Sequence, residues 1–489
     1  MVLSEDEVSR HNTRSSCWVI IRGEAYDMTD FLDQHPAGPE IILKYAGKDA
    51  TEEFVRLLFL SQKSSVNLVE PVHRDGLLEE TLSQDKQLGP VQMLREPANR
   101  LAVVQHQIED KALEPKVPLQ QLRMRSLTEM PMKDICKKKL TQRAWTYFSS
   151  AADDSLSDEL NQKVFRHVLF RPRVMRNVKD LDLSTTILGQ HSSLPVFIAP
   201  AALAKLAHPD GECGLARGAG ETGIIQIVSS SASMTPEAIA SSRVTDTQCQ
   251  FYQLYVVSER HKTEAILRRV KQAGYKGLVV TVDTAVLGKR ELDERYKATL
   301  ISETDEKPKP LGFTHGGWLT PTLCWDDLQW IRGIWDGPIA VKGIMTAEDA
   351  LIAAQHGVQA IYLSNHGGRQ LDTSPPSLMT LLEIRRYCPD IIEKVEIFLD
   401  GGFRRGNDVI KALALGARAC GIGRPFMYAL GAYGHEGVVR AVDVLRRELE
   451  IGMRLAGVTR IDELTPDHVN TKWLDMMVAE PAVFRLANL

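Results

Sequence analysis

Eight short apolar segments follow one another from residue 190 onward, and this alternation constrains the fold more than any other feature. The segments are 194–199, 224–229, 251–255, 278–283, 339–342, 360–364, 395–400 and 419–423. Between most of them lie stretches with helical periodicity, such as 260–273, 346–356 and 405–415. The last two stretches are followed by Gly357 and Gly416, as is typical of helix ends. Strand and helix alternating eight times predict parallel pairing and closure into a TIM (β/α)8 barrel.

The composition is that of a globular protein with room for two or three domains in its 489 residues. Lys plus Arg (59) nearly balances Asp plus Glu (63), which gives a formal net charge of -4. This balance argues against nucleic-acid binding and against a basic membrane-binding face. We therefore expect small-molecule ligands.

Cysteine usage and the chain ends bear on location. The seven cysteines are scattered, without a CxxC pair or a metal-ligand spacing, which is typical of free thiols in a reducing compartment. No apolar run approaches the roughly 18 residues of a membrane span, and the start MVLSEDEVSRHN is acidic and polar, unlike a targeting peptide. We expect a cytoplasmic protein. The final Ala-Asn-Leu is similar to the peroxisomal SKL signal but lacks its basic middle residue, and leaves a peroxisomal location as the alternative.

The pattern changes twice along the chain. Residues 1–75 contain short apolar segments and turns, and we interpret them as a small α+β domain; residues 76–116 are charged and irregular, and we interpret them as a linker. The barrel domain then occupies 117–489. Within it, the connection from 284 to about 337 is polar, rich in Gly and Pro and unusually long, which indicates an active-site lid or a disordered loop.

A histidine and an arginine lie three residues apart in the run SNHGGRQLD, from Ser364 to Asp372, directly after the sixth apolar segment. Histidine is the side chain best suited to take a proton near neutral pH. Arginine holds a carboxylate through two parallel hydrogen bonds. We interpret His366 and Arg369 as a base beside a carboxylate clamp.

Polar residues also close the neighbouring segments. They are Gln253 and Tyr255 after the third, Thr281 and Asp283 after the fourth with Arg290 beyond, Lys342 after the fifth, and Asp400 with Arg404 after the seventh. In such a barrel all C-terminal strand ends open on one mouth. Each residue alone fits an ordinary polar barrel mouth, but the set predicts an active site.

Glycines and arginines follow the last two segments, where this fold commonly holds a phosphate on backbone N–H groups. The residues are Gly401, Gly402, Gly421 and Gly423, with Arg404 and Arg424. They imply a phosphorylated cofactor. Taken alone, they also fit other phosphate-binding barrels, including those that resemble inosine monophosphate dehydrogenase.

The motifs TVDT, LGKRELD, VKG, SNHGGRQLD, DGGFRRGNDVIKALALGA and GIGRPF together resemble the FMN-dependent α-hydroxy-acid oxidase/dehydrogenase family. The resemblance extends from about residue 117 to 457. AWTYFSSAADD is similar to the helix-end tyrosine motif of the family and adds Tyr147 to the site.

The resemblance implies a role for each matching residue. For catalysis it implies His366 as base and Asp283 as the carboxylate that stabilises its charged form. It implies Arg369 and Tyr147 as partners of the substrate carboxylate, Tyr255 as partner of the substrate hydroxyl, and Arg290 as a residue that assists the carboxylate or the developing charge. For FMN it implies Ser229, Gln253, Thr281 and Lys342 at the ring, Asp400 at the ribityl chain, and Arg404, Gly423 and Arg424 at the phosphate. Ser231 matches a pocket position that is small in relatives that take aromatic acids.

Residues 11–59 resemble a cytochrome b5 domain, through CWVIIRGEAYDMTDFLDQHPAGPEIILKYAGKDATEEF. His35, in HPAG, matches the first haem ligand, so the metal position of the resemblance is the iron of haem b. The position of the second ligand is Leu58, whose side chain has no lone pair. Either the domain keeps its shape without haem, which we favour, or His73 folds back as an unusual second ligand.

The two resemblances together match the architecture of flavocytochrome L-lactate dehydrogenases. They imply oxidation of an (S)-2-hydroxy acid, with lactate as leading substrate, in a homotetramer. The electron acceptor stays open between oxygen, a quinone and cytochrome c. Two alternatives are a binding or scaffold protein on a decayed enzyme and a different phosphate-binding flavin barrel. The presence of His366, Asp283 and Arg369 argues against decay.

Overall fold

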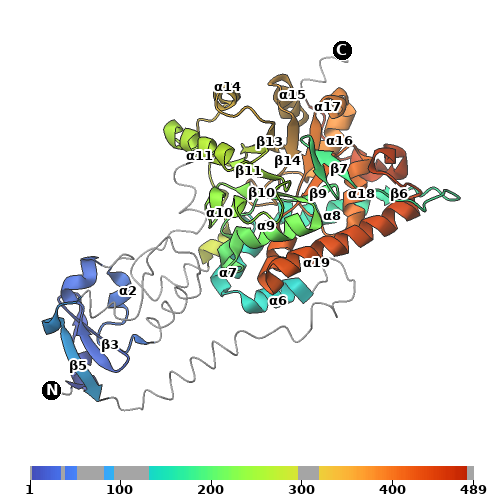
Figure 1. Ribbon diagram of the computed structural model, residues 1–489. Helices are drawn as coiled ribbons and strands as arrows, with labels where there is room; N and C mark the ends of the chain where they lie inside the picture. The colour runs from blue at the N-terminus through green and yellow to red at the C-terminus, as the bar shows by residue number, and fades with distance from the viewer. Residues whose placement is uncertain (1–2, 35–38, 52–81, 93–130, 296–318, 482–489) are drawn as a thin grey trace. The chain divides into compact units, whose positions relative to one another are not determined.

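The computed structural model describes residues 3–34, 39–51, 82–92, 131–295 and 319–481 (Figure 1). Its internal contacts divide the chain into two compact units, Met1–Lys116 and Val117–Leu489.

The described part of the first unit is a small sheet with short helices. The strands lie in the order β1-β5-β4-β3-β2, with bounds β1 (Leu3–Ser4), β2 (Asn12–Thr13), β3 (Ser16–Ile21), β4 (Glu24–Asp27) and β5 (Gln87–Gln92). The helices are α1 (Glu5–Ser9) and α2 (Glu40–Leu43). Val19, Ile21 and Tyr26 are buried in its core. His35, Leu58 and His73 lie outside the described residues, so both haem alternatives remain sequence predictions.

The second unit contains a closed barrel of eight parallel strands, and the predicted TIM fold is confirmed. The strands are β9 (Val196–Ile198), β10 (Ile225–Ser229), β11 (Gln250–Leu254), β12 (Gly277–Thr281), β13 (Ile339–Ile344), β14 (Ala360–Leu363), β15 (Glu396–Leu399) and β16 (Ala419–Ile422). Each pairs with its successor, and β16 pairs with β9. The strands are almost wholly buried because side chains fill both of their faces.

Aromatic side chains fill the inside of the barrel. Phe197 meets Tyr362 and Phe398 edge to face, with ring centroids 5.4 and 5.6 Å apart. The hairpin of β7 (Thr185–Ile187) and β8 (Gln190–Ser192) adds Ile187 and Leu188 to the same apolar cluster. The barrel is therefore a packed core, and small ligands must bind at its mouth.

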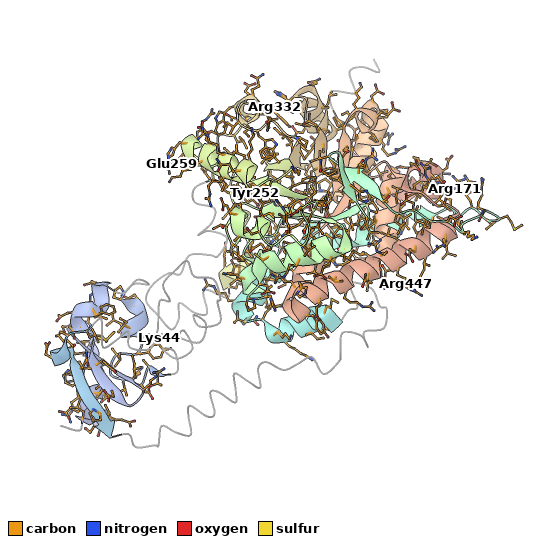
Figure 2. All side chains as sticks on the ribbon, viewed as in Figure 1. Lys44, Arg171, Tyr252, Glu259, Arg332 and Arg447 are labelled. Carbon is orange, nitrogen blue, oxygen red and sulfur yellow. The ribbon has the colours of Figure 1, made fainter. Side chains whose placement is uncertain are left out.

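Helices surround the barrel (Figure 1). Those between strands are α9 (Gly211–Thr222), α10 (Pro236–Ala240), α11 (Arg260–Gln272), α14 (Asp327–Arg332), α15 (Ala347–Gln355), α16 (Ser377–Tyr387), α17 (Asp390–Lys394) and α18 (Gly406–Ala414), and α19 (Arg424–Ala456) follows β16. The three helical stretches predicted from periodicity are confirmed within about a residue. Tyr252 is buried between barrel and helices, whereas Glu259 and Arg447 are exposed on the outside (Figure 2).

Three helices precede the barrel: α6 (Pro131–Lys139), α7 (Gln142–Ser149) and α8 (Leu156–Lys163). The middle of the predicted lid or disordered loop, 296–318, lies outside the described residues, and helix α14 lies in the rest of that connection. Among the described residues, no helix is both long enough and apolar enough to span a membrane.

Candidate active site

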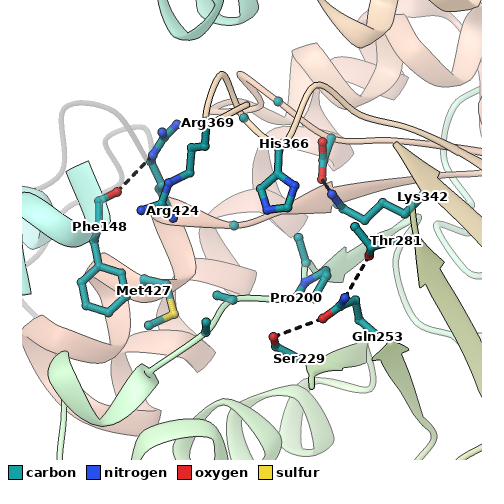
Figure 3. A pocket seen from close by; sticks show the side chains of 18 of the residues that line it. Phe148, Pro200, Ser229, Gln253, Thr281, Lys342, His366, Arg369, Arg424 and Met427 are labelled. Atoms are coloured by element: carbon teal, nitrogen blue, oxygen red, sulfur yellow. Dashed lines mark hydrogen bonds and ion pairs between the residues drawn. The ribbon is translucent and has the colours of Figure 1, made fainter. Parts of the chain in front are cut away.

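A cavity opens at the C-terminal ends of the barrel strands (Figure 3). The predicted site residues that line it are Tyr147, Ser229, Ser231, Gln253, Tyr255, Thr281, Arg290, Lys342, His366, Arg369, Asp400, Arg404, Gly423 and Arg424. Asp283 is the exception and lies behind His366, to which it is hydrogen bonded. The residues come from segments far apart in the sequence, and the closed barrel brings them together.

His366 is held between a carboxylate and a phenol. Its Nδ1 lies 2.9 Å from Oδ1 of Asp283, and its Nε2 lies 3.3 Å from the hydroxyl of Tyr255. A proton on Nδ1 donates to Asp283, which leaves the lone pair of Nε2 facing Tyr255 and the cavity. His366 itself adopts φ 59°, a left-handed conformation that directs its side chain away from the strand.

Burial shifts the pKa values of His366, Asp283 and Tyr255. It lowers the pKa of His366 below the usual value, and Asp283 opposes that shift only in part. Burial also opposes the ionisation of Asp283, but His366 and Lys342 outweigh it and lower the pKa of that carboxyl to about 2. Burial, with the nearby Asp283 charge, raises the pKa of Tyr255. At neutral pH the arrangement is a neutral base, an ionised partner and a protonated phenol.

Two guanidinium groups lie over the ring of Tyr147, with the carbons of Arg369 and Arg290 at 5.0 and 6.0 Å from its centroid. Arg369 donates to the backbone carbonyl of Tyr147. The Nε atoms of both arginines are buried and have no hydrogen-bond partner among the described residues. Burial, followed by the charge of Arg290, lowers the pKa of Arg369 to about 9. This pair of cations is suited to bind a small carboxylate.

On the other side of the cavity, Ser229, Gln253 and Thr281 form a row (Figure 3). The hydroxyl of Ser229 donates to Oε1 of Gln253 at 3.2 Å, and Nε2 of Gln253 donates to Thr281 at 3.0 Å. The row presents amide and hydroxyl groups to the cavity from three adjacent strands. Such groups match the ring edge of a flavin.

The phosphate end of the cavity is defined by Arg404, Arg424 and Gly423. Arg404 is partly buried, and desolvation together with the charge of the nearby Arg424 lowers its pKa, so this end of the cavity favours an anion. Nη1 of Arg424 donates to Oδ1 of Asp158 at 2.6 Å, and the same guanidinium donates to the backbone carbonyls of Phe148 and Ser150. Gly423 leads into the 33-residue helix α19, and a side chain there would meet no atom closer than 4.0 Å. A phosphate fits this helix N-terminus, and the residues present therefore fit FMN.

Helix α8 supports the loop that carries His366. Asn161 and Asn365 exchange two buried hydrogen bonds of 2.8 and 2.9 Å, and Asp372 accepts from the first N–H groups of α8, those of Leu156 and Ser157. A Cβ at Gly402 would approach the carbonyl oxygen of Asn161 to 1.8 Å. The close approach of α8 therefore requires glycine there.

Two residues that hold the site together were missed by the sequence analysis. The hydroxyl of Ser364 contacts Lys342, Asp400 and the backbone of His366. The side chain of Gln370 donates to the carbonyls of Asp283 and Val286 and accepts from the N–H of Gly288, which joins the base loop to the carboxylate loop. Both residues lie within SNHGGRQLD, so their position was the available signal.

Comparison with known proteins agrees with this geometry. Residues 136–471 match the family model described as FMN-dependent dehydrogenase, and residues 4–90 match the cytochrome b5-like Heme/Steroid binding domain. L-lactate dehydrogenase (cytochrome) of Wickerhamomyces anomalus is 38% identical over 96% of this chain and 80% of that protein. Glycolate oxidase of Spinacia oleracea is 39% identical over 69% of this chain and 94% of that protein.

Solved structures give the same result. The recombinant flavin-binding domain of baker's yeast flavocytochrome b2 superposes with a TM-score of 0.69 at 37% identity, over 79% of this chain and 95% of that chain. The resemblance stated from the motifs is thus confirmed.

Proposed function

The chain belongs to the FMN-dependent dehydrogenase family, and we propose that it oxidises L-lactate or a related (S)-2-hydroxy acid to the 2-oxo acid. The observation that carries this proposal is one cavity lined by a neutral histidine and by two arginines whose buried Nε atoms have no hydrogen-bond partner among the described residues. A 2-hydroxy acid offers the matching pair of groups, a hydroxyl next to a carboxylate.

FMN, when bound, supplies the acceptor for the two electrons of the oxidation. Ser229, Gln253, Thr281 and Lys342 would hold its ring. Asp400 would hold the ribityl chain, and Arg404, Gly423 and Arg424 would hold the phosphate. All eight residues line the same cavity, and the five that would hold the ring and the ribityl chain are buried, which supports that assignment.

The substrate carboxylate would bind Arg369, with Arg290 and the hydroxyl of Tyr147 beside it. Tyr255 would donate to the substrate hydroxyl, since its raised pKa keeps the phenol protonated. These contacts select one face of the hydroxyl-bearing carbon. Discrimination between enantiomers follows from the two fixed points and the base.

His366 would take a proton from the substrate on Nε2. As the imidazole gains charge, the carboxylate of Asp283, 2.9 Å from Nδ1, stabilises the imidazolium. Asp283 is ionised across the working pH range because its pKa is about 2. The proton taken from the substrate therefore stays on His366, and Asp283 keeps its negative charge.

For the first unit we propose a cytochrome b5-like domain that works without haem. The domain end expected at residue 75 is too early, because strand β5 (Gln87–Gln92) pairs with β1 and β4 in the sheet of this unit. We therefore propose that the domain includes β5 and that the linker to the barrel domain follows β5 within the predicted segment 76–116. The argument against haem is chemical: Leu58 stands at the second ligand position and cannot bind iron. Oxygen, a quinone or another soluble acceptor would then reoxidise the flavin. We further propose a homotetramer in the cytoplasm, where the seven free cysteines would stay reduced.

The test is an absorbance spectrum of the purified protein, followed by anaerobic addition of L-lactate and, separately, D-lactate. We expect a flavin spectrum without a Soret band and bleaching by the L enantiomer alone. Equal bleaching by both enantiomers would remove the roles of His366 and Arg369. A protein without flavin would favour a scaffold or a different barrel enzyme.

A further inference from the structure

The first residue after strand β14 is a serine whose hydroxyl is fully buried. Ser364 is 0% exposed, and the hydroxyl lies among three functional groups. It donates to Oδ1 of Asp400 at 2.6 Å and accepts from Nζ of Lys342 at 2.9 Å. It also accepts from the backbone N–H of His366 at 3.0 Å. A hydroxyl has one proton and two lone pairs, so its bonding capacity is used completely.

This hydroxyl decides where the Lys342 ammonium lies. Nζ of Lys342 is 3.8 Å from Oδ2 of Asp283 and 3.7 Å from Oδ2 of Asp400, too far for a hydrogen bond to either. Within the described chain, its one hydrogen bond goes to Ser364. Oδ2 of Asp283 is buried and has no hydrogen-bond partner in the part of the chain that the structure describes. Without the hydroxyl, the ammonium could form a direct pair with one carboxylate.

The same hydroxyl also holds the base. His366 occupies the left-handed region at φ 59°, which a non-glycine residue adopts only when its surroundings hold it there. Its N–H is bound by Ser364, and its side chain is bound by Asp283. One buried atom therefore fixes both the cation and the backbone from which the base projects. Figure 3 shows Lys342 and His366 on adjacent strand ends at the same side of the cavity.

We propose that Ser364 is a positioning residue that keeps the Lys342 ammonium between the two carboxylates, available to the cofactor, and sets His366 at the same time. The proposal rests on the function proposed above, because it assigns Lys342 to the flavin ring. It predicts that removal of the hydroxyl weakens the stabilisation of negative charge at the flavin more than it weakens flavin binding.

The test uses the FMN-loaded enzyme and the Ser364→Ala variant. Sulfite serves as an anionic probe of the flavin, and its dissociation constant is measured from flavin absorbance in the absence of substrate. We expect the constant to rise by about tenfold or more, since a hydrogen bond to a charged buried group is worth at least that. We expect kcat for L-lactate to fall by a similar factor, KM to change less, and FMN content to stay equal.

Ser377→Ala is the matched control. Ser377 is 2% exposed, and its buried hydroxyl has no hydrogen-bond partner among the residues that the structure describes. Its removal therefore tests the loss of a buried serine hydroxyl alone. The control should match the wild type in sulfite affinity and in kcat. If Ser364→Ala does not fold, Ser364→Cys keeps the shape with a weaker donor and should show a smaller loss in the same direction.

A sulfite affinity within about twofold of wild type in the folded Ser364→Ala or Ser364→Cys variant would overturn the proposal, whatever the melting temperature. Because sulfite is not a substrate, the titration remains valid even if no 2-hydroxy acid reduces the flavin. If no 2-hydroxy acid reduces the flavin, the proposed function fails, but the sulfite titration still tests the role of Ser364.

Discussion

Asp283→Asn removes one charge from the site and leaves its geometry in place. The amide oxygen can still accept from Nδ1 of His366, which lies 2.9 Å from the carboxylate oxygen. The imidazolium that forms during the reaction loses a unit negative charge at a distance of about 4 Å. At an effective dielectric constant of about 20, that charge is worth about 4 kcal/mol. We therefore expect the rate of flavin reduction to fall by about 10³.

The assay is anaerobic stopped-flow reduction of the bound flavin by L-lactate. Flavin content and substrate affinity should change much less than the rate, because Asp283 contacts the base rather than the carboxylate clamp. Asp327→Asn is a suitable control, since Asp327 is also buried but pairs with Arg260 in helix α11. A rate for Asp283→Asn within about threefold of wild type would refute the electrostatic role.

Asp283→Asn should also change how the rate of flavin reduction depends on pH. His366 acts as a base only when neutral, so the rate should fall at low pH as His366 gains a proton, below the usual range of histidine. Asp283 raises the pKa of His366 by its charge, against the effect of burial. Asp283→Asn should therefore move the low-pH limb to still lower pH. A limb that moves to higher pH, or stays in place, would contradict the assignment of that limb to His366.

Three further outcomes are expected. His366→Ala should retain FMN and lose turnover with L-lactate by about 10² to 10⁴ or more, as measured in steady state, because the base is gone. Ser231→Trp should raise KM for aromatic 2-hydroxy acids more than KM for glycolate, since residue 231 is buried at the cavity wall; an equal change for both would remove it from the substrate pocket. Leu58→His should add a Soret band to the absorbance spectrum if the cytochrome b5-like domain retains a haem pocket. If the wild-type protein is instead red and loses its haem on His73→Ala, His73 is the second haem ligand.

The barrel could be predicted from sequence because its strands are buried on both faces. Such strands appear as short apolar runs, and each was located to within a few residues: the run 194–199 became Val196–Ile198. Parallel order then follows from the intervening helices. His366 and Arg369 could be predicted as site residues because they directly follow a barrel strand, and the C-terminal ends of all barrel strands lie at the same end of the barrel. Helix α14 was missed because it lies in a long polar connection without clear periodicity.

Ser364 and Gln370 could not be predicted in the same way. A serine at the end of an apolar run carries no signal, and the partners of Ser364 are 22 and 36 residues away in the sequence. Gln370 acts through backbone groups more than 80 residues earlier. Such roles arise only when the closed barrel places separate loops side by side. They belong to tertiary structure rather than to any local pattern.

The active site depends on helix α8, which precedes the barrel strands in the sequence. A fragment that began at β9 would contain His366, Asp283, Lys342 and Arg369, yet it would lack the helix on which their loop rests. The asparagine pair, the carboxylate of Asp372 and the close approach at Gly402 would all lose their counterparts. The smallest catalytically competent piece of the second unit must therefore start upstream of Leu156, although that residue lies 40 positions before the first barrel strand.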